Sequence, residues 1–538
     1  MAQNITLMGA SYSDVPSVLL PKTGGGTASF TDVTDTTASA NDVAAGKYFY
    51  TAAGVKTEGT STGGGGTTAG TVTQDANGYI VLDDDAPTQP TLITKSITAN
   101  GTYNASSDNA DGYSSVTVNV SGGGGGGGDM TDPIRFFDYD GTLVASYTSV
   151  PASLPSVPTH TGLTNGTWNY TLQQVTTQFN AMGTCDVGAN YTTSSGATEI
   201  DIVLQEGRLH PYLSLAVNGT VSIDWGDNTT PDSVTGTDLS TRISTINHEY
   251  SQAGSYTIKI SKTSGTGYAL KCTSIYTLLN KNTSDGNPSR VYSNCVKAVR
   301  VGANCSLGSY AFGYLWSIES VSLPSNVEVL SNSTYIFGYC YSLPYVSIPQ
   351  SLASNTSINY MFYSCYCLEH VSIAGGVSLN FGTHAFYACY NLKSISVTSN
   401  TDTIGNNTFY YCYSIKQVEI PNGVTSIGSS AFTNCYNFST IDIPNGVTSI
   451  GNNAFSGCYS VSTLEIPASV TSIGNNAFNY CYGMKEYHFL RTESVPTLGT
   501  TAFGSIQSDC IIYVPNSKLN DYKTAENWAT YASYMVGE

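Results

Sequence analysis

Charged side chains are scarce in this chain of 538 residues. Asp, Glu, Lys and Arg make up 11% of it, whereas ordinary soluble domains carry about 25%. The 20 basic residues face 38 acidic ones, which gives a net charge of −18, and they gather in no patch. This composition argues against nucleic acid or an anionic membrane surface as a partner.

Long apolar runs are absent as well. No segment reaches the about 18 apolar residues of a membrane-spanning helix, so we expect no membrane insertion. Residues 1–8 have neither the basic region nor the apolar core of a secretory signal, so we expect synthesis in a host cytoplasm without a signal peptide. The richness in Thr, Ser, Asn and Gly is nevertheless typical of extracellular proteins. This combination favours a virion component that is released by lysis.

No His or carboxylate recurs in register with the repeated cysteines in the second half of the chain, so the sequence does not indicate a metal site. Asp442 and Glu465 occupy equivalent positions one repeat apart, as the paired acids of a glycan hydrolase could. Both are expected to be exposed, whereas one acid of such a pair must stay protonated. The sequence therefore predicts no catalytic residue, no metal site and no cofactor.

A phrase built on Phe, Cys and Tyr recurs through the second half of the chain. Its strictest copies, Phe-x-x-Cys-Tyr, follow one another every 23 residues and begin at Phe409, Phe432, Phe455 and Phe478. Three looser copies precede them, and the series keeps the phenylalanine without the cysteine at Phe312 and Phe503. A fixed period of this length is typical of a solenoid, in which each rung buries its apolar face only against its neighbours.

Each rung is predicted to contain two short strands, such as Thr440–Ile443, which ends at Pro444, and Val447–Ile450. Seven of the 13 cysteines hold one equivalent position. They cannot all pair, and in stacked rungs their side chains would point the same way, so we expect buried free thiols. The predicted ladder of buried structural side chains comprises Phe337, Phe362, Phe386, Phe409, Phe432, Phe455 and Phe478 with Cys340, Cys365, Cys389, Cys412, Cys435, Cys458 and Cys481.

The pattern Ile-Pro-x-x-Val-Thr-Ser-Ile-Gly-x-x-Ala-Phe-x-x-Cys closely resembles the BspA-like leucine-rich repeat, over residues 291–510. The tail, in which Ile511–Pro515 precedes a helical pattern of Leu519, Tyr522, Trp528 and Tyr531, is similar to the closing cap of that family. Such a cap keeps the last rung from exposing its apolar face.

The N-terminal quarter is divided by two glycine runs. The phrases at Phe30–Tyr50, Thr73–Asp84 and Ile97–Val118 resemble the N-terminal segments of tail-fibre proteins from phages and prophages of gut bacteria. That resemblance implies docking on other phage tail or baseplate proteins. The alternative is a generic, linker-rich stalk.

Between this region and the solenoid lie two further segments. Asp138 and Asp140 match the opening of the haloacid-dehalogenase phosphatases, but three prolines follow where that family needs a helix, so we predict a hairpin turn. A helix is expected near Leu172–Met182.

The following segment resembles a polycystic-kidney-disease-type (PKD-like) β-sandwich. The motifs that carry this resemblance are Val221–Asp227 and His248–Ile258, and Trp225 and His248 are expected in the core. Asp224 and Asp227 are expected to bind turn amides rather than calcium.

The predicted fold is mainly β and modular. Its parts are an N-terminal virion-anchoring module (1–62), a glycine linker (63–66), a small β-rich stalk module (67–121), a second glycine linker (122–128), a connecting module (129–198), a PKD-like β-sandwich (199–262), a BspA-like leucine-rich-repeat solenoid (263–510) and a cap of one strand and a helix (511–538).

Tyrosines occupy two kinds of position in the repeats. The residue after each cysteine is always Tyr, at 341, 366, 390, 413, 436, 459 and 482, and there we favour ring packing over binding. Where the residue varies between rungs, the stacking of the rungs does not require one residue type. Tyr mixed with Ser, Asn and Gly is typical of adaptable recognition surfaces. The predicted receptor-binding residues are Tyr339, Tyr363, Tyr387, Tyr410, Tyr411, Tyr480, Tyr345 and His370. The alternative is a solvated surface with scattered tyrosines.

Together these features predict a phage tail fibre or receptor-binding protein, located in the virion tail. Its N-terminus would dock on the particle, and its solenoid would contact a glycan or protein of the host surface without catalysis. A homo-oligomer such as a trimer is compatible with this role. The alternatives are a bacterial BspA-like surface adhesin and a tail-borne glycan depolymerase.

Overall fold

The computed structural model describes residues 132–538, except 275–276, 281–291, 356–358, 375–380, 396–401 and 419, together with ten short strands between residues 3 and 118. The chain divides into two compact units, Met1–Gly122 and Gly123–Glu538. Both predicted glycine linkers, and most of the phrases that resemble tail-fibre proteins, lie outside the described residues.

The described strands of the first unit form antiparallel pairs, which agrees with the predicted β-rich character of this region. The pairs are β1 (Gln3–Leu7) with β2 (Ala10–Val15), β3 (Ser17–Pro21) with β4 (Thr27–Thr31), β5 (Tyr48–Tyr50) with β6 (Lys56–Glu58), β7 (Val72–Gln74) with β8 (Ile80–Leu82), and β9 (Gly101–Thr102) with β10 (Thr117–Val118).

The second unit begins with a small module, named here the lateral module, that comprises residues 132–193. Its sheet has the order β12-β11-β14-β13, with strands β11 (Ile134–Phe137), β12 (Leu143–Tyr147), β13 (Leu163–Trp168) and β14 (Cys185–Thr193). The expected hairpin is present, since β11 and β12 are antiparallel and Gly141 takes a φ of +89° in the turn between them. The expected helix is α1 (Leu172–Met182), whose N-terminus carries a capping box of Thr171 and Gln174.

The segment 199–262 does not form a separate sandwich, which corrects the PKD-like prediction. Its strands belong to one nine-stranded sheet with the path β17-β16-β18-β15-β20-β22. The bounds are β15 (Thr198–Leu204), β16 (Tyr212–Asp224), β17 (Asp232–Asn247), β18 (Gly254–Leu270), β19 (Leu279–Asn280), β20 (Val296–Arg300), β21 (Cys305–Leu307), β22 (Ser320–Ser322) and β23 (Glu328–Val329). β18 crosses the predicted boundary at residue 262, and β15, which would be an edge in an isolated domain, pairs with β20 of the first rungs.

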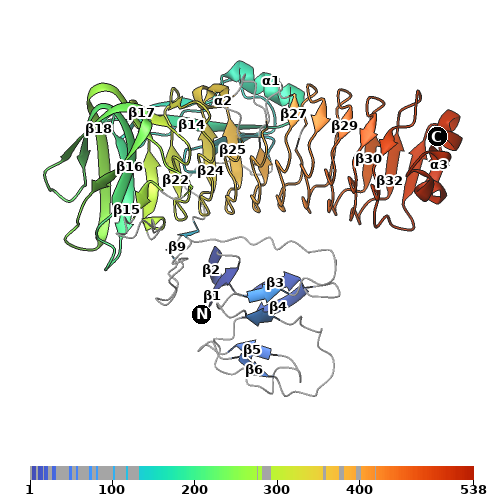
Figure 1. Ribbon diagram of the computed structural model, residues 1–538, viewed down its shortest axis with the longest axis horizontal. Coiled ribbons are helices and arrows are strands. Elements are labelled where there is room, and N and C mark those ends of the chain that lie inside the picture. Colours follow the sequence, from blue (N-terminus) through green and yellow to red (C-terminus); the bar gives the residue numbers. More distant parts are fainter. Residues whose placement is uncertain are drawn as a thin grey trace. The chain divides into compact units, whose positions relative to one another are not determined.

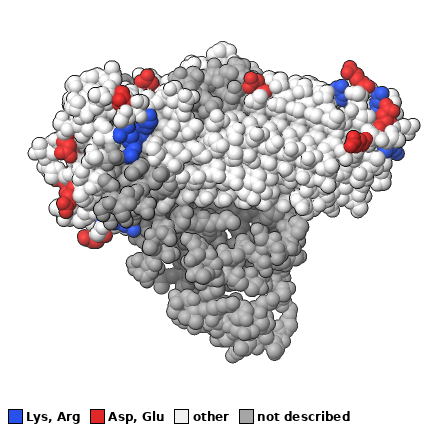
Figure 2. All heavy atoms as spheres, viewed as in Figure 1, with Lys and Arg blue, Asp and Glu red and all other residues white. Residues whose placement is uncertain are grey.

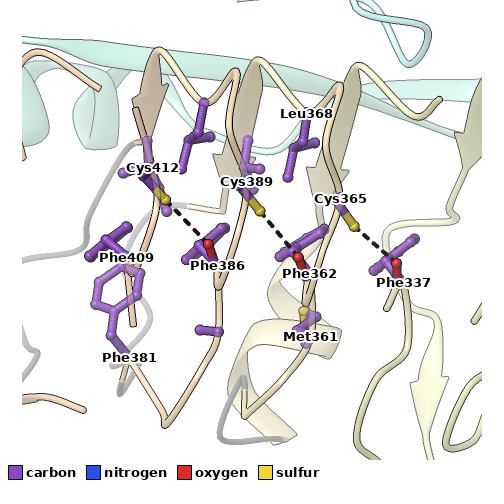
Figure 3. Close-up of a cluster of buried hydrophobic side chains, with 14 of the residues drawn as sticks. Phe337, Met361, Phe362, Cys365, Leu368, Phe381, Phe386, Cys389, Phe409 and Cys412 are labelled. Carbon is purple, nitrogen blue, oxygen red and sulfur yellow. Dashed lines mark hydrogen bonds between the residues drawn. The ribbon is translucent and has the colours of Figure 1, made fainter. Parts of the chain in front are cut away.

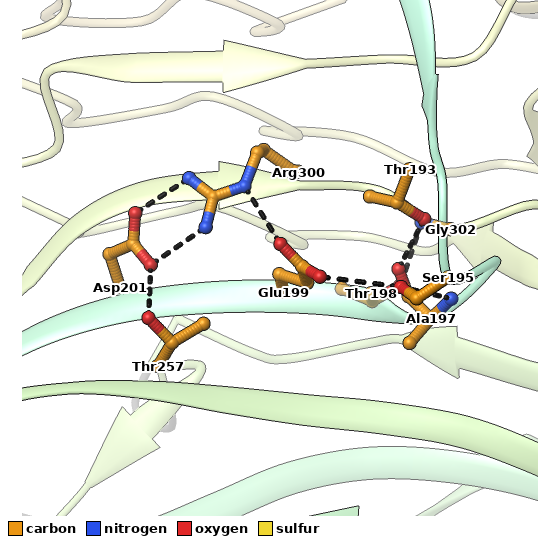
Figure 4. Close-up of polar contacts among 9 residues, drawn as sticks. All are labelled: Thr193, Ser195, Ala197, Thr198, Glu199, Asp201, Thr257, Arg300 and Gly302. Carbon is orange, nitrogen blue, oxygen red and sulfur yellow. Dashed lines mark hydrogen bonds and ion pairs between the residues drawn. The ribbon is translucent and has the colours of Figure 1, made fainter. Parts of the chain in front are cut away.

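Polar contacts stabilise the junction between β15 and β20. Arg300 of β20 donates two hydrogen bonds to Asp201, of 2.6 and 2.8 Å, and a third of 3.1 Å to Glu199, both on β15 (Figure 4). The bidentate geometry suits the planar guanidinium group. The nine-stranded sheet is therefore continuous with the solenoid rather than hinged to it.

The remaining rungs stack as a parallel solenoid (Figure 1). Its helix and strands are β24 (Tyr345–Ile348), α2 (Gln350–Asn355), β25 (His370–Ile373), β26 (Ser394–Ile395), β27 (Thr403–Ile404), β28 (Ser426–Ile427), β29 (Ser449–Ile450), β30 (Thr463–Ile466), β31 (Ser472–Ile473), β32 (Glu486–Phe489), β33 (Thr497–Leu498) and β34 (Ile511–Val514). The predicted strand Thr440–Ile443 is not assigned in its own rung, but β30 is its equivalent one rung later.

The interior holds the predicted ladder. Phenylalanine rings from Phe312 to Phe503 stack in one continuous series, with centroids 5.0 to 5.7 Å apart. Each of the seven cysteine thiols donates a hydrogen bond to the phenylalanine carbonyl of the preceding rung, at 3.0 to 3.3 Å (Figure 3). All 13 cysteines are free. The sulfur is therefore a weak donor as well as an apolar filler.

The cap matches the expected strand and helical pattern, but the helix is broken. β34 is followed by η3 (Asn516–Lys518), α3 (Leu519–Thr524), η4 (Ala529–Tyr534) and β35 (Met535–Gly537). Asn527 takes a φ of +63° between the two helical parts, which a continuous helix does not allow. Trp528 is fully buried, and its ring meets Phe489 edge-on at 5.0 Å.

Candidate functional site

Two positions in every rung hold the backbone in the left-handed region. One lies two residues before the ladder phenylalanine, and its φ is 54 to 58° in all nine rungs. The other lies two residues after it, with φ values of 57 to 75°. Such conformations favour Gly or Asn and disfavour bulky side chains.

At the first position, four later rungs respect this preference and the four rungs before them do not. Asn407, Ser430, Asn453 and Asn476 fill the first position in four successive rungs. The four preceding rungs carry aromatic rings there instead, at Tyr310, Tyr335, Tyr360 and His384. A strained backbone residue costs about 1–3 kcal/mol, so the turn geometry itself gives no reason for these rings.

The rings at these turns form one contiguous patch, named here the aromatic cluster. Its members are Tyr310, Tyr314, Tyr335, Tyr339, Tyr360, Tyr363, His384, Tyr387, Tyr410 and Tyr411. One column stacks Tyr310, Tyr335, Tyr360 and His384, with centroids 4.6 to 4.9 Å apart. A second column stacks Tyr363, Tyr387 and Tyr410 at 4.7 and 5.1 Å. Tilted contacts join the columns, as between Tyr335 and Tyr363 at 5.8 Å, and Tyr339 packs on Tyr363 at 5.2 Å.

The cluster is electrically neutral. Burial is the main cause that raises the pKa of the Tyr335, Tyr339 and Tyr410 hydroxyls, and neighbouring tyrosines add to the rise. Burial also lowers the pKa of His384, so its imidazole is uncharged near pH 7. The members are half-buried. The surface therefore offers aromatic edges and neutral hydrogen-bonding groups without formal charge.

Charge is scarce over the neighbouring rungs too. Figure 2 shows one face of the molecule, on which acidic and basic residues gather toward the two ends of the second unit. The surface between these ends is almost free of them. A partner of this surface would meet little electrostatic steering.

The tyrosine after each cysteine forms a third column. The rings from Tyr341 to Tyr482 stack at 4.5 to 5.5 Å, as the sequence predicts. Trp316 extends this column by one rung, 6.2 Å from Tyr341. These rings are half-buried and their faces are occupied by one another. This ladder contributes to rung packing along most of the solenoid.

Six of the eight predicted receptor-binding residues lie at the turns. Tyr339, Tyr363, Tyr387, Tyr410 and Tyr411 all belong to the aromatic cluster. Tyr480 is 43% exposed but lies several rungs away, beside Tyr482. The other five cluster members were not predicted from the sequence. Four of them share one signal, an aromatic residue two positions before the ladder phenylalanine, where four later rungs carry Asn or Ser. The fifth, Tyr314, lies two positions after Phe312.

Tyr345 and His370 are placed differently from the prediction, because both lie inside the molecule. Their exposed fractions are 1% and 5%, beneath Phe137 of the lateral module. Outward strand positions of β24 and β25 are covered by β14 and its neighbours, and Asn169 donates to the Ser372 hydroxyl at 2.9 Å. We therefore exclude these two residues from the candidate surface.

The carboxylates that the sequence suggested as catalytic or calcium-binding groups are either hydrogen-bonded within the protein or exposed. Tyr191 donates to Asp138 at 2.9 Å, and His160 Nε2 lies 2.7 Å from the same carboxylate. Asp224 accepts from the amide of Gly226, as the turn prediction requires. Asp442 and Glu465 are both exposed. Among the described residues, no three His, Cys, Asp or Glu side chains are grouped to hold a metal ion.

Comparison with known families decides what the solenoid is. A family model described as "BspA type Leucine rich repeat region" matches residues 288–416 and 402–522, with six copies. The solenoid is a BspA-type leucine-rich repeat region. This confirms the resemblance on which the repeat prediction was based. No curated protein matches the chain, and no helix in the described segments is long and apolar enough to cross a membrane.

Solved structures with leucine-rich repeats are similar to parts of this chain. A leucine-rich repeat protein from Bacteroides ovatus ATCC 8483 is 21% identical over 44% of this chain and 63% of its own, with a TM-score of 0.30. This chain therefore spans less than two thirds of that structure. A leucine-rich cell surface protein from Faecalibacterium prausnitzii A2-165 is 18% identical over 52% of this chain and 94% of its own, with a TM-score of 0.22. The T. pallidum leucine-rich repeat protein is 21% identical over 42% and 84%, with a TM-score of 0.26.

Proposed function

We propose that the chain is a non-catalytic recognition protein of the adhesin type, which binds another surface through the aromatic cluster of its BspA-type repeats. The observation that carries this proposal is the placement of Tyr310, Tyr335, Tyr360 and His384 at left-handed turn positions. The next rungs show that Asn or Ser satisfies the same turn. A residue type that opposes its local backbone preference is typical of a functional position.

Tyrosine is also suited to this role. It buries a large rigid area with little loss of side-chain entropy, and its hydroxyl can donate or accept. The stacked columns hold the rings in place before any partner arrives, which reduces the entropy lost on binding.

The test measures binding of the fluorescently labelled full-length chain to panels of bacterial and animal cells by flow cytometry. The variant replaces Tyr387, Tyr410 and Tyr411 with Ser, which should keep the fold because other rungs hold Ser, Thr or Asn there. A binding hot spot is worth about 2 kcal/mol or more per aromatic side chain, so we expect the apparent affinity to fall at least about a hundredfold.

A matched control replaces three half-buried tyrosines outside the cluster, Tyr212, Tyr256 and Tyr513, with Ser. This control should bind like the unchanged chain. Equal binding by all three proteins, or equal loss in both variants, would refute the cluster as the binding surface.

We also propose which particle or cell bears this recognition protein. We favour a phage tail fibre, docked by its N-terminal unit on other tail or baseplate proteins, because the phrases near Phe30 and Ile97 resemble such fibres. The alternative, a bacterial surface adhesin, fits the repeat family at least as well. Gold-labelled antibodies to the solenoid distinguish them by electron microscopy. Label on the tails of purified virions supports the fibre, whereas label confined to the envelope of producing bacteria supports the adhesin.

A further inference from the structure

The aromatic cluster ends abruptly along the solenoid. In the first column, Asn407 takes the place that follows His384, and in the second, Thr433 follows Tyr410. Within the described chain, His384 and Tyr410 contact only rings of their own or earlier rungs, so no further ring stacks beyond them. The last ring of each column therefore meets small polar residues instead of another ring.

This boundary is named here the aromatic step. Its wall consists of His384, Tyr410 and Tyr411, and its polar side consists of Asn407, Thr433 and Asn434. Tyr411 stands nearly perpendicular to Tyr410, at 70° and 4.3 Å, so the rings form a corner rather than a flat stack. The Thr433 hydroxyl already donates to the carbonyl of Asn453 at 2.6 Å, which leaves its oxygen as an acceptor. The asparagine amides can both donate and accept.

The chemistry of this corner limits the ligand. No member is charged near pH 7, because burial keeps His384 neutral, so an anionic or cationic group would lose hydration without a counter-charge. Aromatic walls with a few oriented polar groups are typical of small-molecule sites. A ligand that fits has an apolar face to lie on a ring and a rim of hydroxyls to meet amides. A neutral sugar ring has both.

We propose that the aromatic step binds a neutral sugar residue of a surface glycan. This inference rests on the proposed recognition function and names the ligand class of the same cluster. A second observation supports it independently of the stacking. His384 and Tyr411 take φ values of 58° and 63°, while the equivalent positions of the next rung hold Asn407 and Asn434 in the same conformation. The wall of the step is thus placed where the backbone favours asparagine.

The decisive variant is Thr433→Tyr. A tyrosine here would extend the column of Tyr363, Tyr387 and Tyr410, and three earlier rungs tolerate tyrosine in that place. It would place a ring against the face of Tyr410 on which no other ring stacks, and so fill the corner. Its own far face would meet Ser456 and Gly457, which have no amide side chain to hold a sugar. The Thr433→Tyr variant has more aromatic surface than the unchanged chain, yet its affinity for the glycan should be lower by about tenfold or more.

Asn479→Tyr is the matched control, since it adds the same side chain to the same column two rungs farther on. It should leave binding unchanged. His384→Asn removes one wall and installs the residue that Asn407 provides in the next rung, so it should weaken binding while the chain stays folded. Thermal melts of all three full-length variants check that fold. Binding that survives both Thr433→Tyr and His384→Asn would overturn the assignment of the step.

The ligand class is tested on the cells that the full-length chain binds. Periodate, which cleaves the vicinal diols of sugars, should abolish binding, and protease should leave it intact. On an array of neutral, sialylated and sulfated oligosaccharides, neutral members should bind and Thr433→Tyr should weaken them. Loss after protease but not periodate, or binding to anionic glycans alone, would overturn the glycan inference and leave the recognition function standing. Binding to no cell at all would refute the recognition function itself.

Discussion

Phe137 stacks on His370, with ring centroids 5.1 Å apart and planes inclined by 25°. The two residues come from the lateral module and from β25, and the contact leaves His370 only 5% exposed. Burial is the main cause that lowers the pKa of His370 to about 4, opposed by Asp186 and assisted by Arg135 and Lys393. A histidine that must stay neutral inside a core makes the docked state sensitive to acid.

The first prediction is therefore a loss of stability as the pH falls from about 6.5 to about 4. In this range the unfolded chain, with a histidine pKa near 6.5, binds a proton that the folded chain excludes, so the free energy of unfolding rises with pH. The pKa of about 4 for His370 corresponds to a total change of about 3 kcal/mol. Urea unfolding between pH 3.5 and 7.5 measures it. His370→Phe keeps the stack without the titrating group, so its curve should lack this component, and identical pH profiles would contradict the prediction.

The same contact shows where sequence reasoning ends. The repeating Phe and Cys positions were predictable because each rung supplies an internal comparison, and stacking demands the same residue at each step. When equivalent positions of the rungs are compared, Tyr345 and His370 resemble solvent-exposed residues on the outer face of a strand. Their burial depends on a module far away in the chain, as the bond between Asn169 and Ser372, 203 residues apart, illustrates. Rung periodicity contains no information about such a partner.

The junction with the nine-stranded sheet was hidden for a similar reason. Trp225 is fully buried and its ring stacks on half-buried His248, with centroids 4.9 Å apart, so the expected packing of Trp225 is present although a separate PKD-like domain is not. The pairing of β15 with β20, however, is long-range, and open backbone donors on an edge strand look alike in a sequence whatever later covers them. The left-handed turns were likewise missed, because Tyr and His give no local signal for a positive φ.

A second prediction concerns the cysteines. Burial raises the pKa of the Cys481 thiol to about 12, so hardly any thiolate exists at pH 8, and thiolate is the reactive form. Ellman's reagent should react with almost none of the ladder thiols in the folded chain and with all 13 cysteines after unfolding. The melting temperature should be the same with and without reductant. Disulfides found by mass spectrometry under non-reducing, denaturing conditions would contradict the thiol ladder.

A third prediction uses Phe455, which is fully buried between Phe432 and Phe478 at 5.2 and 5.7 Å. Phe455→Ala should destabilise its surroundings by about 3–5 kcal/mol, as other buried aromatic truncations do. Coupling in a solenoid is mainly between neighbours. Hydrogen exchange should therefore speed up most in the adjacent rungs and least in β16–β18. A uniform loss of protection throughout the second unit would show that the unit opens as one cooperative body instead.

The last prediction tests the backbone strain at the left-handed turns, from which we infer that the aromatic cluster is functional. Asn453 has a φ of 54° and stands in the rung column that begins with Tyr310. Asn453→Gly should change the free energy of unfolding by less than about 0.5 kcal/mol, because glycine adopts this conformation freely. Asn453→Val should cost about 1–2 kcal/mol, because a branched side chain opposes it. His384→Asn exchanges a strained ring for a favoured residue but loses a stack with Tyr360 worth about 0.5–1.5 kcal/mol, so we expect the two effects to offset each other. Urea denaturation compares the three. Equal stability of the Gly and Val variants would mean that these turns tolerate any side chain, and the tyrosines there would need no functional explanation.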